Sequence, residues 1–148
     1  MNKFVLFLCF SLLCRAALAH PQDELSPEEL MHYYVRMFNE ENLAALQDVY
    51  HFPHARIRSG RLTYVESLSG PVIDFDELKK AGWKYSKINH VTVLAEGNNA
   101  ALVEMNFSRF NADGNEYLVQ TAFYSLTKNK GYWQIICLQN IGASSGNR

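Results

Sequence analysis

Three turn signals divide the C-terminal half of the chain into four apolar runs, and this pattern constrains the fold more than any other feature. The turns have the sequences EGNN (96–99), NADGN (111–115) and KNKG (128–131). Gly, Asn and Asp tolerate the positive φ angles that tight hairpin turns require. We therefore expect residues 88–141 to form four consecutive antiparallel β-strands.

Alternation within these runs predicts which side chains face a core. In the second run one face carries Ala101, Val103, Met105 and Phe107, and the other carries Glu104, Asn106 and Ser108. In the last run Trp133, Ile135, Cys137 and Ile141 are expected to share a face. The run 117–127 is apolar on both faces. Period-two alternation is typical of strands with one face on a core. A sheet that is apolar on both faces needs two covers, which helices and a second subunit can supply.

The first half of the chain predicts helices and one hairpin. A first helix is expected to begin at Ser26-Pro27 and to end near Asn42. Ser26 can cap free amides, Pro27 suits the first helical position, and Glu29 completes a capping box. A second helix is expected over 43–50, a hairpin over 54–66, and a third helix over 75–81. The expected fold is therefore α+β: a cone-shaped, curved antiparallel sheet of about six strands, packed by three N-terminal helices.

The N-terminus predicts export. Residues 1–19 combine Lys3, an apolar run and a small-x-small ending at Ala19, which is the pattern of a secretory signal peptide. We expect a signal peptide at 1–19, a leader at 20–25, one domain at 26–141 and a tail at 142–148. The mature protein is expected to be periplasmic or secreted, with no membrane attachment after cleavage.

Charge and cysteine content narrow the function classes. Cleavage removes Lys3 and Arg15, which leaves 12 basic residues against 15 acidic ones and a formal net charge of −3. No basic stripe is present, so nucleic acid is not an expected partner. Cleavage also leaves Cys137 as the only thiol, and we interpret it as a buried small hydrophobe rather than a catalytic group.

The order of elements and several short phrases resemble the SnoaL-like branch of the nuclear-transport-factor-2-like superfamily. The phrases are Tyr34 to Asn39, Leu43 to Tyr50, His51-Phe52-Pro53-His54, Gly82-Trp83, Phe107 to Phe110 with Asp113-Gly114, and Gly131 to Ile135. The resemblance covers nearly all of 26–141. It implies a cone fold, a small-molecule cavity and, as in many members, a homodimer that pairs through the sheet. The superfamily includes ketosteroid-isomerase-like enzymes, which use a Tyr hydroxyl to stabilise an oxyanion. The resemblance implies that Tyr34 of the first helix could play this role.

Seven side chains are candidates for a site in such a cone. The two catalytic candidates are His54, a general base that titrates near neutrality, and Tyr34. The ligand-binding candidates are Arg56, Arg109, Tyr50, His90 and Tyr124. Arg109 ends an otherwise apolar strand face, where it could bind a carboxylate or enolate oxygen. Each has a structural alternative: a hydrogen-bonded histidine, a solvent-reaching or ion-paired arginine, or a core tyrosine with a satisfied hydroxyl.

Two functions follow from these observations. The first is an exported domain that binds a small apolar or amphipathic organic molecule, with acid–base lyase or isomerase chemistry as an extension that needs no cofactor and no metal. The alternative is a non-catalytic homodimeric binding or scaffold domain. The semi-apolar second face of the sheet favours this alternative.

Overall fold

The computed structural model describes residue 22 and residues 25–66 and 73–144 of the chain. The predicted signal peptide lies outside the described residues, as do most of the leader and of the tail. Within the described ranges, no helix combines the length and the apolar character needed to cross a bilayer. The domain expected at 26–141 is described except for residues 67–72.

Three helices form where the capping residues predict them. They are α1 (Pro27–Asn39), α2 (Leu43–Val49) and α3 (Phe75–Lys80). At the start of α1 the Glu29 amide donates to Ser26 Oγ (3.3 Å) and the Ser26 amide donates to Glu29 Oε2 (2.8 Å), which completes the expected capping box. At the start of α3 the Asp74 side chain accepts a hydrogen bond from the Glu77 amide. The first helix ends three residues earlier than expected, and Asn42 instead caps α2.

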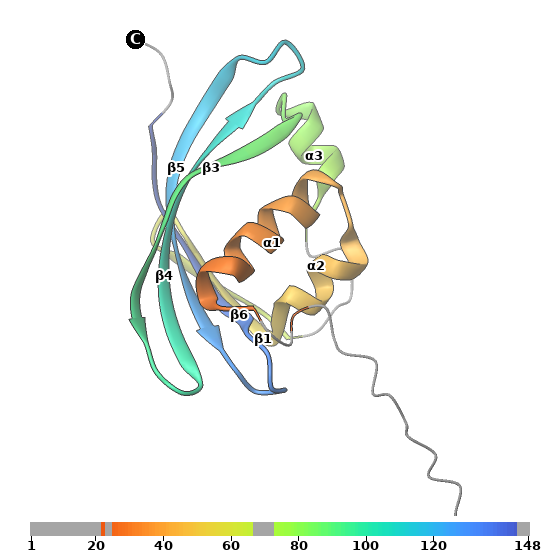
Figure 1. Ribbon diagram of the computed structural model, residues 1–148. Coiled ribbons are helices and arrows are strands. Elements are labelled where there is room, and N and C mark those ends of the chain that lie inside the picture. The colour runs from red at the N-terminus through yellow and green to blue at the C-terminus, as the bar shows by residue number, and fades with distance from the viewer. Residues whose placement is uncertain (1–21, 23–24, 67–72, 145–148) are drawn as a thin grey trace, which may run out of the picture.

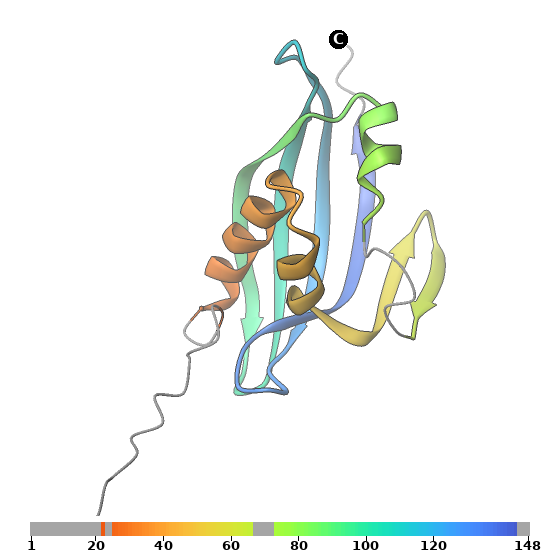
Figure 2. The same ribbon diagram turned by 90° about the vertical axis from the view of Figure 1, so that its right-hand side faces the viewer.

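Six strands form one curved sheet. They are β1 (Tyr50–Arg58), β2 (Arg61–Val65), β3 (Tyr85–Glu96), β4 (Ala100–Phe110), β5 (Glu116–Thr127) and β6 (Gln134–Ser144), in the spatial order β2-β1-β6-β5-β4-β3. The four strands expected over 88–141 are confirmed, and β3 begins slightly earlier. The helices all lie on the concave side of the sheet (Figure 1), and the β1–β2 hairpin extends one end of it (Figure 2).

One pair of strands differs from the expected antiparallel sheet. β1 runs parallel to β6, whereas every other neighbouring pair is antiparallel. The sheet is therefore mixed. The reason is that β6, the last strand, enters between β1 and β5: its direction is fixed by the hairpin with β5, and the direction of β1 is fixed by the chain that leaves α2. Strands far apart in the sequence thus become neighbours at the centre of the sheet.

The core lies between α1 and the concave face. Ala101, Val103, Met105 and Phe107 are buried there, which confirms the predicted inner face of β4. On β5 the buried side chains are Ala122, Tyr124 and Leu126, so the ambiguous run 117–127 turns Phe123 to the outer face. The side chain of Asn39 then joins the end of α1 to the edge strand: it donates to the Ser86 carbonyl and accepts from the Ser86 amide, both at 2.8 Å.

Two of the register shifts in the sheet move side chains away from the face that alternation predicts for them. Ile88 pairs with Phe107 and His90 pairs with Asn106, so Asn89 is an extra residue and His90 turns to the outer face. In β6, Ile135 pairs with Leu126 and Cys137 with Ser125, so Ile136 is the extra residue.

The expectation that Cys137 and Ile141 share the face of Ile135 is therefore wrong. Directly paired residues lie on the same face of a sheet, and the partners of Cys137 and Ile141 point outward. Cys137 is half-buried on the convex side rather than in the core.

Candidate functional site

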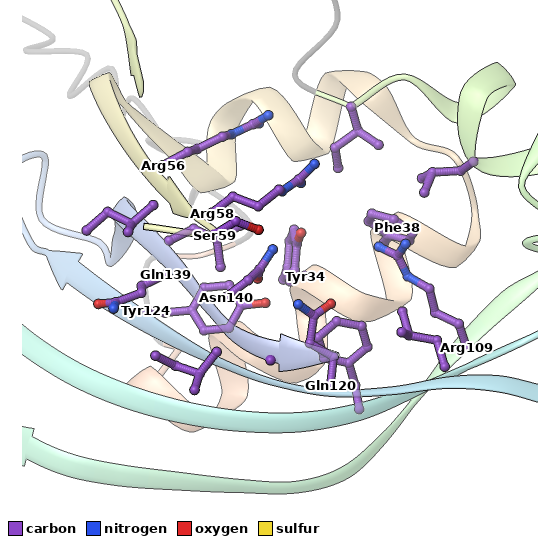
Figure 3. A pocket seen from close by; sticks show the side chains of 18 of the residues that line it. Tyr34, Phe38, Arg56, Arg58, Ser59, Arg109, Gln120, Tyr124, Gln139 and Asn140 are labelled. Carbon is purple, nitrogen blue, oxygen red and sulfur yellow. The ribbon is translucent and has the colours of Figure 1, made fainter. Parts of the chain in front are cut away.

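A cavity of about 890 Å³ lies between the concave face of the sheet, α1, α3 and the turn of the β1–β2 hairpin (Figure 3). Its volume falls in the range of roughly 300–1,000 Å³ typical of small-molecule sites. Its apolar walls include Phe38, Ile73, Leu78, Phe107, Leu118 and Leu138. Its polar lining includes Tyr34, Tyr50, Arg56, Arg58, Asp74, Glu77, Arg109, Gln120, Tyr124 and Asn140.

Three buried tyrosines meet at the floor of the cavity. Tyr50 donates its hydroxyl hydrogen to the Tyr34 hydroxyl oxygen, at 3.0 Å. The Tyr34 ring contacts the rings of Tyr50 and Tyr124 edge to face, each with 6.0 Å between centroids. Since Tyr34 accepts from Tyr50, its own hydrogen is available to an acceptor in the cavity.

Burial keeps these hydroxyl groups protonated. It raises the pKa of Tyr34, and it raises the pKa of Tyr50 and of Tyr124 well above the ordinary value of 10.0. The hydrogen bond from Tyr50 and the charges of Arg109 and Arg56 partly offset the rise for Tyr34. At neutral pH the cluster therefore offers hydrogen-bond donors, not phenolates.

Arginines reach the same space from opposite walls. In Figure 3, Arg56 and Arg58 enter from β1, Arg109 enters from β4, and Tyr34 lies between them. The guanidinium carbon of Arg56 lies 5.8 Å from the centre of the Tyr50 ring. That of Arg109 lies 5.8 Å from the Phe38 ring centre and 5.7 Å from the Phe107 ring centre. These distances place both guanidinium groups in cation–π contact with aromatic rings of the lining.

Five of the seven predicted site residues line this cavity. They are Tyr34, Tyr50, Arg56, Arg109 and Tyr124. The tyrosines are at once core residues and cavity lining, so the structural alternative also holds for them.

His54 and His90 do not line it. The side chain of His54 is fully buried beside the rings of Tyr50 and Phe52, outside the lining. The bulge at Asn89 places His90 on the outer face, where its Nε2 lies 3.4 Å from Glu104 Oε1.

The His54 ring is held in its neutral form. Burial and, to a smaller extent, the nearby charge of Arg56 lower its pKa from 6.5 to about 4, although the Ile135 and Ile136 backbone groups oppose the shift. The neutral imidazole of His54 also lies outside the cavity lining. The structure therefore gives His54 the geometry of a core residue.

Sequence reasoning missed several polar residues of the lining, among them Arg58, Gln120 and Asn140. Arg58 had a signal, because it lies two positions after Arg56 on the same strand and so shares its face. Gln120 shares the inner face of Tyr124 by the same rule. Asn140 had none, because the bulge at Ile136 reverses the faces of β6.

Two carboxylates stand at the rim, and both have partners within α3. Asp74 Oδ1 accepts from the Glu77 amide at 2.9 Å, and Glu77 Oε1 accepts from Lys80 Nζ at 2.8 Å. Across the described ranges, no cluster of three or more His, Cys, Asp or Glu side chains could hold a metal ion.

Comparison with known proteins identifies the family to which this architecture belongs. A family model described as "NTF2-like protein (DUF6841)" matches residues 23–142, most of the chain. A search of the curated proteins finds no match.

Similar solved structures include an NTF2-like protein with a cystatin-like fold from Novosphingobium aromaticivorans (16% identity, TM-score 0.59, covering 76% of this chain and 77% of that one). An NTF2-like protein of unknown function from Pseudomonas putida KT2440 has 12% identity and a TM-score of 0.59, with 81% and 92% covered. A candidate dehydratase of the NTF2-like family from Streptomyces avermitilis has 13% identity and a TM-score of 0.57, with 80% and 92% covered. At these identities the likeness extends to the fold.

Proposed function

We propose that this chain, which belongs to the NTF2-like family described as DUF6841, binds a small organic molecule in the cavity between its sheet and its helices. The observation that carries the proposal is the convergence of polar groups from α1, β1 and β4 on one space with apolar walls. Small-molecule sites combine apolar walls with a few such groups. The pattern of residues 1–19 supports the further proposal that the protein acts after export.

Binding is better supported than acid–base chemistry. A lyase or isomerase needs a base within hydrogen-bond reach of the ligand. The described residues of the lining include no histidine, and Asp74 and Glu77 stand at the rim with other partners. One structural neighbour is a candidate dehydratase, and the Tyr34 hydroxyl would suit an oxyanion in such chemistry. The arginines and tyrosines of the lining can bind a ligand by hydrogen bonds and charge without acting as acids or bases.

Binding can be tested with a neutral fluorescent probe, N-phenyl-1-naphthylamine, whose emission rises in apolar surroundings. We expect saturable binding by the wild-type protein. Leu118→Trp places an indole in the cavity from β5 and should weaken binding roughly tenfold, because it removes the space that the probe occupies. Fluorescence titration measures both affinities.

Leu94→Trp is the matched control. It makes the same substitution at an exposed leucine of β3 that does not line the cavity, so probe affinity should stay within about twofold of wild type. No saturable binding, or equal losses in the two variants, would contradict the proposal.

A second candidate function, a dimeric scaffold, is favoured by the convex face of the sheet. Leu102 and Ile141 are exposed large hydrophobic side chains there, and the outward-facing Val119 and Phe123 are only half-buried. They lie on the neighbouring strands β4, β5 and β6, with polar side chains such as Glu104 and Thr121 between them. Such surfaces on soluble proteins commonly mark protein–protein contacts, and a second copy would supply the missing cover.

Sedimentation equilibrium tests this assembly. We expect twice the mass of the mature chain for wild type and a monomer for Phe123→Glu, because a buried carboxylate without a partner opposes association. Probe binding in the cavity should persist in the variant. A monomeric wild-type protein at micromolar concentration would rule out the dimer.

A further inference from the structure

We propose that the molecule bound in this cavity is an amphipathic carboxylate whose anionic group lies between the Arg109 guanidinium and the Tyr34 hydroxyl, with its apolar body along Leu118 and Leu138. The inference rests on the proposed binding function and specifies the chemical class of the ligand. It comes from the imbalance between the cations and the anions that face the cavity.

Arg109 carries the strongest part of the argument. Its Nε atom is buried and has no hydrogen-bond partner. Its guanidinium group lies over the rings of Phe38 and Phe107, and no described carboxylate forms an ion pair with it. The residue is half-buried, and its guanidinium group also interacts with the Tyr117 hydroxyl, which carries no charge. Partial removal of a cation from water costs free energy unless an opposite charge compensates. A ligand anion would supply that charge, and a carboxylate matches the planar, two-pronged geometry of a guanidinium group.

The remaining charges of the lining favour the same ligand. Three arginines (Arg56, Arg58 and Arg109) line the space against two carboxylates, Asp74 and Glu77, whose oxygens accept hydrogen bonds within α3. The positive potential reaches the tyrosine floor: the charge of Arg109 counteracts the burial-driven rise in the pKa of Tyr34 and Tyr124. An anion placed in that field is stabilised, and a cation is repelled.

The donor geometry specifies where the anion sits. Because Tyr34 accepts a hydrogen bond from Tyr50, it can donate its own hydrogen to a ligand oxygen. Hydrogen bonds to charged groups contribute more than neutral ones, roughly 1.5–3 kcal/mol against about 1. The apolar walls beyond this point leave space for a hydrocarbon body, and the cavity of about 890 Å³ exceeds what a bare inorganic anion requires.

Two probes of nearly identical shape separate this inference from binding in general. 8-Anilinonaphthalene-1-sulfonate is N-phenyl-1-naphthylamine with one added sulfonate. We expect the wild-type protein to bind the anionic probe at least roughly tenfold more tightly. Arg109→Gln should reduce the affinity for the anionic probe roughly tenfold and leave that for the neutral probe within about twofold.

Two variants serve as comparisons. Arg61→Gln removes an exposed arginine of β2 outside the lining and should change neither affinity. Arg58→Gln removes a second cationic side chain of the lining, at an exposed position. If Arg109→Gln does not fold, this variant still shows how loss of a positive charge changes the affinity for the anionic probe relative to the neutral one. Circular dichroism establishes that each variant is folded.

Competition identifies the anion as a carboxylate. 2-Naphthoate should displace the bound anionic probe at a concentration at least roughly tenfold lower than the neutral 2-naphthamide, and no higher than 2-naphthyl phosphate. Equal affinity for the two fluorescent probes, an equal loss of both in Arg109→Gln, or preferential displacement by the phosphate would overturn the inference while leaving small-molecule binding intact. Failure of both probes to bind would overturn the binding proposal as well.

Discussion

Trp83→Ala should lower the free energy of unfolding by about 3–5 kcal/mol, the usual cost of removing a large aromatic side chain from a core. Trp83 is only 3% exposed. Its ring lies 5.2 Å from the Phe38 ring centre and 5.5 Å from that of Phe75, and its Nε1 donates to Ser86 Oγ at 3.0 Å. One side chain thus joins α1, α3 and β3, and Phe38 in turn lines the cavity.

Urea denaturation measures the loss, and two variants interpret it. Trp83→Phe retains most of the ring contacts but not the hydrogen bond, so it should cost less than Trp83→Ala, although more than the roughly 1 kcal/mol of one hydrogen bond. Tyr64→Ala removes an aromatic ring that is 64% exposed on β2 and should change stability by no more than about 0.5 kcal/mol. If Trp83→Ala behaved like Tyr64→Ala, the aromatic cluster would not hold the helices on the sheet.

Stability should fall on acidification because of His54. The pKa of this imidazole is about 4 in the folded protein, against 6.5 as its ordinary value. Between these values the unfolded chain binds a proton that the folded chain excludes. The stabilisation is therefore fully present above pH 6.5, is lost as the pH falls toward 4, and levels off below that. The shift corresponds to about 3 kcal/mol at 1.36 kcal/mol per pKa unit.

The comparison that isolates His54 is its replacement by a neutral side chain. His54→Gln should be less stable than wild type at pH 7.5, and the difference should shrink by about 3 kcal/mol between pH 7 and pH 4. The carboxylates titrate equally in both proteins, so they cancel in the difference. Parallel profiles for wild type and His54→Gln would show that the imidazole titrates normally.

The helices and strands were largely predictable because their signals are local. Ser26 with Glu29, and Asp74 with the amide of Glu77, act over three residues. The turns at 96–99, 111–115 and 128–131 likewise contain within themselves the Gly and Asn residues that they require. The inner face of β4 follows from alternation because no bulge interrupts that strand before Arg109.

The candidate site was predictable only in part. Arg109 was found from its place at the end of an apolar face, and Tyr34 through a family resemblance. His54 was misjudged: a histidine at the start of a hairpin suggests an exposed mouth, yet tertiary packing buries it beside Tyr50 and Phe52. His90 was expected on the face of Ile88, and one inserted residue moves it to the opposite side.

Local signals suffice for the kinds, order and approximate ends of the helices and strands, because caps, turns and periodicity act between residues a few positions apart. Pairing between strands sets the bulges at Asn89 and Ile136, the parallel alignment of β1 with β6, and hence the meeting of Arg56 and Arg109 across one cavity. All of these features depend on hydrogen bonds between strands, and β1 and β6 lie far apart in the chain. A one-residue shift in such a ladder exchanges the two faces of a strand, and local alternation carries no record of it.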